Sequence, residues 1–563
     1  MSSATPFEWA SRITNAERAG DTDEANALSI QAVDAHPKSA DLHNLGGNLR
    51  MRQGQAIEAA KWFSKAAALD PSRIDLVVNA AIALSRAGEH ETACEKLRQC
   101  EQMGRESASY CSTRGTAERG AGRPGNGAVW YDRALALEPH RTKALHGRAR
   151  VALERGEPMA THLYDQLLAQ TPQDPNLWLG KAQALDMIGD KDGAFAIAEQ
   201  LAQKAPRFVD GLRFNAQLRS DRGEHGYDEI FARAAKSAPD DPRIALGHIS
   251  LLISVERYDD AANIASENWS HHGDVQFALL EATARDAAGD HQTAAAIFER
   301  LEMPERDIAV ELARHAIRTG RLYLACRRLD TALQRKPWDQ QAWALRLVCW
   351  RLKDDPRADW LAGGGKLARP VRLADADQLL AATIPVLDEL HDRSPFPLGQ
   401  SLRGGTQTRG ILFDRTEAEL GNLREAVQNA LEEYRDMLPP ADPSHPFLRY
   451  RDAPWELRGS WSVRLQGGGT YHAAHIHPGG VLSSALYVRV PDDTALADEK
   501  AGWLELGRPP PNLNVDLEPL TMIKPEPGLL ALFPSFFFHG TRPFQSGSRM
   551  SVAFDVSISR EFA

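Results

Sequence analysis

At 563 residues the chain is too long for a single hydrophobic core, so we expect two or more structural units. A hydrophobic fraction of 43% is ordinary for a globular protein, and a net charge of −10 argues against a dedicated nucleic-acid binder, which usually presents a basic face. No apolar run approaches the roughly 20 residues of a membrane span, and the N-terminal segment lacks a signal-peptide pattern, so we expect a cytoplasmic protein without membrane association.

Glycine recurs through the first 350 residues with a period close to 34. The strictest part of the series is Gly20, Gly54, Gly88 and Gly122, and the spacing continues less strictly at Gly156, Gly189, Gly223, Gly289 and Gly320. A proline follows most of these glycines by 16 or 17 positions, as at Pro71 and Pro139. A period of this length is typical of stacked helical hairpins. We count about ten units, two of them degenerate, because residues 240–290 lack the turn glycine and Arg105 replaces a proline.

Residues 42–71 illustrate one unit. Leu42, Leu45 and Leu49 share one helical face, Gly54 makes the turn, and small residues with Phe63 form the stripe of a second helix. The pattern resembles the tetratricopeptide repeat family. The resemblance implies a superhelix with a groove that recruits a protein or peptide partner, and self-association of the array into a homo-oligomer is the alternative.

The pattern changes after residue 356. Residues 362–365 (Ala-Gly-Gly-Gly) have linker composition, and helices are expected within 373–393 and 415–437. From about residue 447, short apolar or alternating runs between turn residues predict strands at 459–466, 482–490, 502–506, 528–534 and 549–558. We therefore expect a repeat array over 1–355, a linker with a connecting helix over 356–384, and a domain with a β-rich core over 385–563.

Histidines cluster in this last domain. His475 and His477 are two residues apart, so in an extended chain both rings point to one face and can chelate one metal ion. The very apolar segment 528–539 ends in His539, which suits a third ligand delivered to the mouth of a barrel. His472 breaks the two-residue alternation and is expected beside the site or exposed.

Arg549 opens the last predicted strand. Alternation places Arg549, Ser551 and Ala553 on one face, which would aim the arginine into the barrel. A buried guanidinium is costly unless an anion pairs with it, and a carboxylate-bearing ligand can supply that anion through two parallel hydrogen bonds. Ser551 can add another hydrogen bond.

Together, His475-Ile-His477-Pro, the distal His539 and Arg549-Met-Ser551 resemble the 2-oxoglutarate/Fe(II) dioxygenase superfamily, in the branch where tetratricopeptide repeats precede the oxygenase domain. The resemblance implies an α+β domain with a double-stranded β-helix (jelly-roll) core that uses Fe(II), 2-oxoglutarate and O2. It makes His475 and His539 iron ligands and places His477 where the superfamily usually has a carboxylate. It also implies that Arg549 and Ser551 bind the far carboxylate of 2-oxoglutarate.

Two further residues follow from the same resemblance: Tyr487 and Arg464 are expected to line the cosubstrate pocket from neighbouring strands. Imidazole in place of carboxylate leaves three readings open. His477 is a third ligand, or His475 and His539 hold the iron with a water in the third position, or the domain binds no metal. The expected function is a hydroxylase. The alternatives are a non-catalytic repeat scaffold and a three-histidine iron dioxygenase that does not use 2-oxoglutarate.

Overall fold

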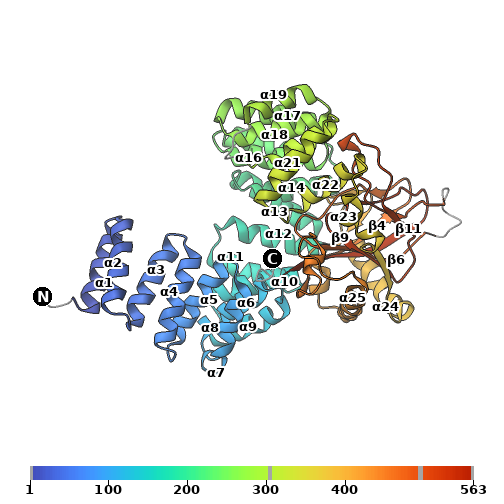
Figure 1. Ribbon diagram of the computed structural model, residues 1–563. Coiled ribbons are helices and arrows are strands. Elements are labelled where there is room, and N and C mark those ends of the chain that lie inside the picture. The colour runs from blue at the N-terminus through green and yellow to red at the C-terminus, as the bar shows by residue number, and fades with distance from the viewer. Residues whose placement is uncertain (1–3, 302–306, 492–498, 559–563) are drawn as a thin grey trace. The chain divides into compact units, whose positions relative to one another are not determined.

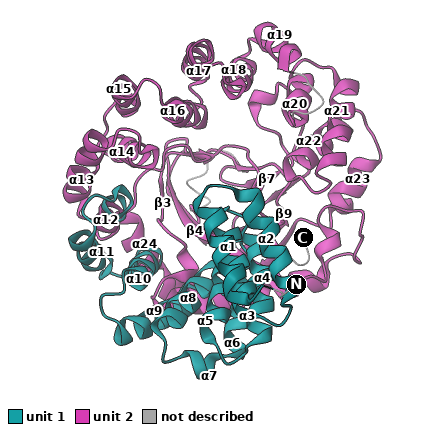
Figure 2. Ribbon diagram, turned by 90° about the vertical axis from the view of Figure 1, so that its left-hand side faces the viewer, with its two compact units in different colours: residues 1–180 teal, residues 181–563 magenta. Residues whose placement is uncertain are grey.

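The computed structural model describes residues 4–301, 307–491 and 499–558 (Figure 1). The chain divides into two compact units, Met1–Gly180 and Lys181–Ala563 (Figure 2). Among the described residues, no helix combines the length and the apolar character needed to cross a membrane.

The first unit consists of helices. They are α1 (Pro6–Arg18), α2 (Thr22–Ala35), α3 (Ala40–Arg52), α4 (Ala56–Leu69), α5 (Ile74–Arg86), α6 (His90–Gln99), α7 (Glu101–Gly104), α8 (Ala108–Gly120), α9 (Pro124–Leu137), α10 (Thr142–Glu154), α11 (Ala160–Gln170) and the first part of α12 (Pro175–Met187). The unit at residues 42–71 folds as predicted: Leu42, Leu49 and Phe63 are buried, and Gly54 adopts a left-handed backbone with φ 76°. Helices α3 and α4 can pack closely because Gly47 on α3 has no side chain and lies against the Phe63 ring on α4.

The second unit continues the hairpins. Its helices are α13 (Lys191–Lys204), α14 (Val209–Asp221), α15 (Glu229–Ser237), α16 (Pro242–Ser254), α17 (Tyr258–His272), α18 (Val275–Ala288), α19 (His291–Leu301), α20 (Ala309–Arg318), α21 (Leu322–Arg335), α22 (Gln340–Leu352), α23 (Arg357–Ala362), α24 (Ala376–Asp392) and α25 (Ala418–Met437). Leaving α7 aside, the described helices α1 to α21 form ten consecutive pairs, which confirms the predicted number of repeats. In the unit without a turn glycine, Glu256 takes its place and adopts φ 63°.

The C-terminal part of the second unit contains antiparallel sheets. Its strands are β1 (Arg369–Arg372), β2 (Leu402–Arg403), β3 (Thr406–Gln407), β4 (Trp455–Gln466), β5 (Tyr471–His472), β6 (Leu482–Arg489), β7 (Leu504–Leu506), β8 (Thr521–Ile523), β9 (Leu529–Pro534), β10 (His539–Thr541) and β11 (Ser548–Ile558). They form a six-stranded sheet in the order β1-β9-β6-β11-β4-β3, a three-stranded sheet β10-β7-β8 and the pair β2-β5. A helical superhelix followed by an antiparallel β domain of jelly-roll type is the predicted fold class.

One prediction about this region needs correction. The strand predicted at 528–534 is β9, but the apolar segment 528–539 is not one strand: β9 ends at Pro534, and His539 opens β10, which pairs with β7 in the other sheet. Residues 356–384, expected as a linker with a connecting helix, contain β1, which pairs with β9. One hydrophobic core runs from Ala309 in the repeats to Val556 in the β domain. The last repeats therefore pack with the β domain in the second compact unit, which begins at Lys181.

The turn ends of the repeats touch the β domain within the second unit. Glu256 forms an ion pair with Arg403, and Gln217 accepts a hydrogen bond of 2.8 Å from the backbone of Leu398. Further along, Arg318 donates to the carbonyl of Asn512 over 2.7 Å. Figure 2 shows helices α13 to α22 as an arc around the strands. This edge of the array is thus occupied by the chain's own β domain.

His391, near the end of α24, is buried and gives a pH prediction. Its ring bonds to Thr406 and Ser462, both at 2.9 Å, and burial, together with the nearby Arg464 charge, lowers the pKa of His391 to about 3. In the unfolded chain this pKa is about 6.5, so the stability that the neutral ring contributes is present above about pH 6.5 and is lost as the pH falls toward 3.

We expect acidification from about pH 7.5 to about pH 5.5 to remove about 1.4 kcal/mol through this residue. In His391→Asn the loss of stability over the same range should be smaller by that amount, because other buried histidines contribute equally to both proteins. Chemical denaturation at the two pH values measures it. An identical pH dependence in wild type and variant would contradict the assignment.

Candidate metal centre and cavity

Three histidines predicted from the sequence come together in the β domain. His475 and His539 pair directly through their backbones, with N–O distances of 3.0 and 2.9 Å in both directions, so one bridge fixes two of the rings side by side. The ring centroid of His475 lies 4.2 Å from that of His539 and 5.0 Å from that of His477. His472 stays outside the trio, with its ring centroid 6.0 Å from that of His475.

Each of the three rings uses Nδ1 as a donor. Nδ1 of His475 faces the carbonyl of Ala473 at 2.8 Å, and Nδ1 of His539 faces that of Phe537 at 3.0 Å. His477 donates from Nδ1 to Oδ1 of Asp555 at 2.6 Å. Hydrogen bonds of this kind fix the tautomer and leave every Nε2 as a lone pair.

These lone pairs converge. Nε2 of His475 and Nε2 of His477 are 3.1 Å apart, and one ligand atom from each of the three residues lies within 4.8 Å of the others. Two lone pairs at this distance repel unless a proton or a cation lies between them. Ligands about 2.1 Å from one ion and at right angles to each other would be about 3.0 Å apart. The donor set therefore fits a metal ion held by three imidazoles.

Burial keeps the rings of His475 and His539 neutral. It lowers the pKa of His475 to about 3, with a further contribution from His477, and it holds the pKa of His539 well below its usual range. Neutral imidazole is the form that binds metal. The aromatic ring of Phe533, whose centroid is 4.8 Å from that of His539, covers one side of the trio.

Asp555 was missed by the sequence analysis. It lies two residues beyond Ala553 on the same strand face, opposite Ser483 on β6, and Ser483 donates to its carboxylate over 3.0 Å. Extending the alternation from Arg549 by three steps reaches this position, so the signal was present. A carboxylate behind a ligating imidazole increases the basicity of the ring and offsets part of the cation's charge.

Asp555→Asn is expected to weaken metal binding by about 10- to 100-fold, because the charge behind His477 is lost while a hydrogen-bond acceptor remains. Competition with a chromophoric chelator for Co(II) measures the affinity. Asp388→Asn is the matched control, since Asp388 pairs with Arg489 and lies outside the histidine trio. Equal affinities in all three proteins would exclude a role for Asp555.

Arg549 is placed as the alternation predicted. It is buried, with 2% of its surface exposed, and it lines the same cavity as the three histidines, together with Ser551 and Ala553. In the described part of the chain no carboxylate forms an ion pair with it, and burial lowers the pKa of its guanidinium. Its Nε and the buried hydroxyl of Tyr487 have no hydrogen-bond partner among the described residues.

Tyr487 and Arg464 differ in their placement. Tyr487 is the cross-strand partner of Ser551, so it shares the inner face, and the Arg549 guanidinium carbon lies 5.1 Å from its ring centroid. Arg464 is the partner of Met550 and therefore lies on the opposite face of the sheet. There it pairs with Asp388 and with Asp392, at 3.4 and 2.8 Å. The expectation that Arg464 lines the cosubstrate pocket is not met.

The histidines and Arg549 line one cavity of about 1010 Å³. The six-stranded and three-stranded sheets both contribute to its wall, through Trp461 and Val463 of β4 and Glu505 in the middle of β7. The repeats contribute as well, with residues from the α16–α17 turn, α20 and α22. A molecule that reaches the histidines is thus enclosed by both the β domain and the repeats of the second unit.

A second cluster of potential ligands is already satisfied. Asp286 accepts hydrogen bonds from His291 at 2.9 Å, from His315 at 2.6 Å and from Arg318 at 2.5 Å. Burial by itself raises the pKa of Asp286, but these hydrogen bonds lower it to about 2. The adjacent guanidinium makes this cluster a structural network and a poor cation site.

Comparisons with known proteins match the repeats and the β domain separately. The family model described as "Putative 2OG-Fe(II) oxygenase" matches residues 459–555, and the tetratricopeptide repeat model matches residues 12–74 and 159–207. Protein FlbA of Caulobacter vibrioides (strain ATCC 19089 / CIP 103742 / CB 15) is 29% identical over 199 residues, which are 34% of this chain and 33% of that protein. The chain thus matches about a third of the length of this curated relative.

Among solved structures, a tetratricopeptide repeat protein from Parabacteroides merdae aligns with a TM-score of 0.36 and 18% identity over 43% of this chain and 97% of that chain. Pseudomonas aeruginosa PilF aligns with a TM-score of 0.32 and 19% identity over 36% and 92%. The chain combines tetratricopeptide repeats with a C-terminal domain that matches the 2OG-Fe(II) oxygenase family.

Proposed function

We propose that the protein is a 2-oxoglutarate- and Fe(II)-dependent oxygenase that hydroxylates its substrate in the cytoplasm. The observation that carries this proposal is the joint placement of two features in one cavity: three imidazoles whose Nε2 atoms converge, and a buried Arg549 without a carboxylate partner. A metal alone would explain the first feature only. A dicarboxylate whose one end binds metal and whose other end pairs with a guanidinium explains both.

The residues of the chain have distinct tasks in this proposal. His475, His477 and His539 would hold the iron through Nε2, with their Nδ1 atoms fixed by carbonyls and by Asp555. Arg549 would pair with the far carboxylate of 2-oxoglutarate. When bound, iron and its cosubstrate supply an oxidation in which 2-oxoglutarate, O2 and a substrate C–H bond give succinate, CO2 and a C–OH bond.

Neighbouring side chains support the cosubstrate. The Ser551 hydroxyl and the Tyr487 hydroxyl lie on the same inner face as Arg549 and can donate to the same carboxylate. Phe533 shields the histidines from solvent on one side. Exclusion of water strengthens each of these charge interactions. The repeats would recruit a protein or peptide partner, as arrays of this family generally do.

Anaerobic titration tests the proposal. Purified protein should take up one Fe(II) and then bind 2-oxoglutarate, with a charge-transfer absorbance that appears only when both are present. On admission of air, labelled 2-oxoglutarate should release succinate. Protein that binds neither iron nor 2-oxoglutarate would favour the non-catalytic scaffold, and turnover without 2-oxoglutarate would favour the three-histidine dioxygenase.

A further inference from the structure

The lining of the cavity is rich in charged side chains. Among the described residues, five arginines and two glutamates line the cavity, and the arginines are Arg314, Arg403, Arg508, Arg542 and Arg549. Glu256 pairs with Arg403, and Glu505 lies 3.3 Å from Arg508. Arg508 also pairs with Glu518 at 3.0 Å, so Arg403 and Arg508 both have carboxylate partners. Within the described residues, Arg314 and Arg549 form no such ion pair.

Arg314 is the repeat-side member of this set. It is partly buried on α20, and its Nη2 donates to Oε1 of Gln341 on α22 over 3.4 Å. Within the described residues it forms no ion pair with a carboxylate. Burial and the charge of Arg318 lower the pKa of Arg314. An unpaired guanidinium in such a place is costly unless an anion binds.

We propose that the substrate carries a carboxylate and that Arg314 pairs with it. This inference rests on the function proposed above, in which Arg549 is taken by 2-oxoglutarate, so a second anion needs a second guanidinium. Arg314 comes from α20 and Arg549 from β11, and the cavity that they share with the histidines is large enough for cosubstrate and substrate together. Gln341 and Tyr258 add neutral hydrogen-bonding groups to the same wall.

Binding of defined probes at saturating 2-oxoglutarate tests the inference. The probes are glutarate, the peptide acetyl-Ala-Glu-Ala-amide and its uncharged Gln counterpart, each measured anaerobically by ligand-observed NMR on the iron-loaded protein. We expect a carboxylate probe to bind wild type, and Arg314→Gln to weaken it at least tenfold. Arg314→Lys should recover part of the affinity. Preference for glutarate or for the Glu peptide identifies a free acid or a peptide as the source of the carboxylate.

Three outcomes would overturn the inference: no binding of either carboxylate probe to wild type, equal binding of the carboxylate probe to wild type and Arg314→Gln, or measurable binding of the Glu and Gln peptides with equal affinity. The affinity for 2-oxoglutarate should be the same in Arg314→Gln and wild type, which also shows that the variant is folded. Failure of the proposed function can be told apart from failure of this inference. If the proposed function is wrong, wild-type protein binds no 2-oxoglutarate, and the glutarate titration still compares wild type with Arg314→Gln.

A second inference comes from the turn at Glu256. Nine other repeat turns in the described chain place glycine at this position, and Glu256 repeats their hydrogen bonds, from its own N to Ile253 and from Arg257 N to Leu252. Left-handed backbone is unfavourable for glutamate. The ion pair with Arg403 leaves the carboxylate side chain 54% exposed, and pairs this exposed add little stability. Stability alone therefore does not account for glutamate here.

We infer that Glu256 is a positioning residue for the metal centre. Its partner Arg403 belongs to β2, which pairs with β5, and Ser401 directly precedes β2. The Ser401 hydroxyl lies 3.3 Å from Nε2 of His475 and 3.2 Å from Nδ1 of His472. The ion pair between Glu256 and Arg403 thus helps to hold the Ser401 hydroxyl beside His475, a proposed metal ligand.

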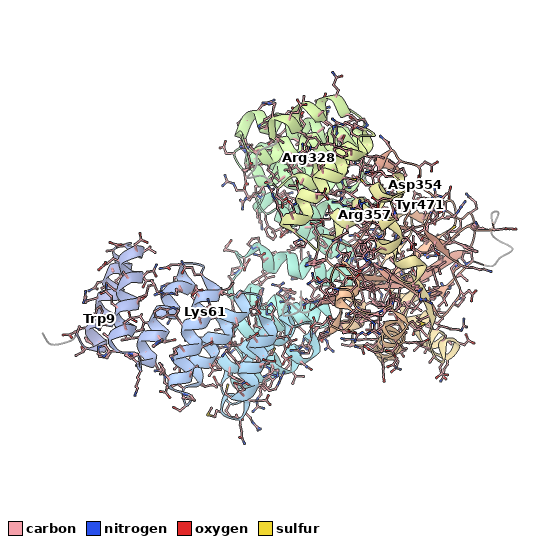
Figure 3. The ribbon with its side chains drawn as sticks, viewed as in Figure 1. Trp9, Lys61, Arg328, Asp354, Arg357 and Tyr471 are labelled. Atoms are coloured by element: carbon pink, nitrogen blue, oxygen red, sulfur yellow. The ribbon has the colours of Figure 1, made fainter. Side chains whose placement is uncertain are left out.

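Two glycine substitutions separate strain from positioning. Glu256→Gly and Asp354→Gly remove the two non-glycine residues from this register of turns, and Asp354 (labelled in Figure 3) does not line the cavity. Both variants should melt at the same temperature as wild type or higher. Only Glu256→Gly should shift the absorption bands of the Co(II)-loaded protein and weaken Co(II) binding at least threefold, and Arg403→Gln should reproduce this. Unchanged spectra in Glu256→Gly would overturn the inference, as would a wild type that binds no cobalt.

Discussion

Replacing His477 with alanine is expected to reduce the affinity for Fe(II) by more than about 100-fold, which exceeds the loss typical of residues that only support a ligand. The reason is the 3.1 Å approach of its Nε2 to that of His475, with both Nδ1 atoms already engaged as donors. If His477 were only a hydrogen-bonding neighbour of the ion, its Nε2 would have to carry a proton and donate it to Nε2 of His475. Its Nδ1 already carries the proton that it donates to Asp555, so Nε2 is left as a lone pair. Anaerobic Fe(II) titration with a competing chelator measures the change.

His472→Asn is the matched control for this variant. His472 lies in the same segment but outside the trio, and asparagine can still bond to Ser401. Its iron affinity should stay within about threefold of wild type, a difference of about 0.6 kcal/mol. If His477→Ala binds iron as wild type does, the reading with two histidines and one water is correct. If no variant and no wild-type protein binds iron, the domain is metal-free.

The position of Asp555 bears on the unusual ligand set. Three neutral imidazoles leave the full charge of a divalent ion, whereas the usual set of two histidines and one carboxylate reduces it by one. Here the carboxylate stands directly behind His477, at 2.6 Å from its Nδ1. Part of the charge is therefore balanced without occupying a coordination position, which accounts for imidazole where the superfamily usually has a carboxylate.

Long periodic elements could be predicted from the sequence. The glycine series located the repeat turns, and the strand expected at 482–490 is β6, Leu482–Arg489. Short elements could not be predicted, because three residues are too few to show an alternating pattern. An example is β10, which belongs to the three-stranded sheet although β9 just before it belongs to the six-stranded sheet. β1, with the sequence Arg-Pro-Val-Arg, contains a proline, which occurs only on edge strands, and its partner β9 is distant in sequence.

The candidate site depended on strand register in the same way. Alternation within β11 correctly gave Arg549 and Ser551 a common face, since it needs only one strand. Placing Arg464 required knowing that it pairs with Met550, and this pairing sets it on the other face. The same alternation reaches Asp555, but its contacts with Ser483 and His477 depend on neighbouring segments of the fold. Side chains on one strand could therefore be assigned to the cavity, whereas relations between strands needed the fold.

The second large effect concerns Arg549. Arg549→Met should weaken 2-oxoglutarate binding by about 100- to 1000-fold, because loss of one partner of a buried charge pair costs about 2–5 kcal/mol. Methionine fills similar space without charge, so the fold should persist. Iron affinity should remain at the wild-type level, since Arg549 is not among the converging ligands. Titration of 2-oxoglutarate into the iron-loaded variant, followed by the charge-transfer absorbance, gives the affinity.

Arg464→Met provides the matched control, because it removes an arginine from a neighbouring strand whose side chain pairs with Asp388 and Asp392 on the other face. Its affinity for 2-oxoglutarate should equal that of wild type. If Arg549→Met binds 2-oxoglutarate normally, the buried guanidinium serves another anion. If the variant turns over without loss of activity, the three-histidine dioxygenase is the correct function, since that chemistry needs no guanidinium for a cosubstrate.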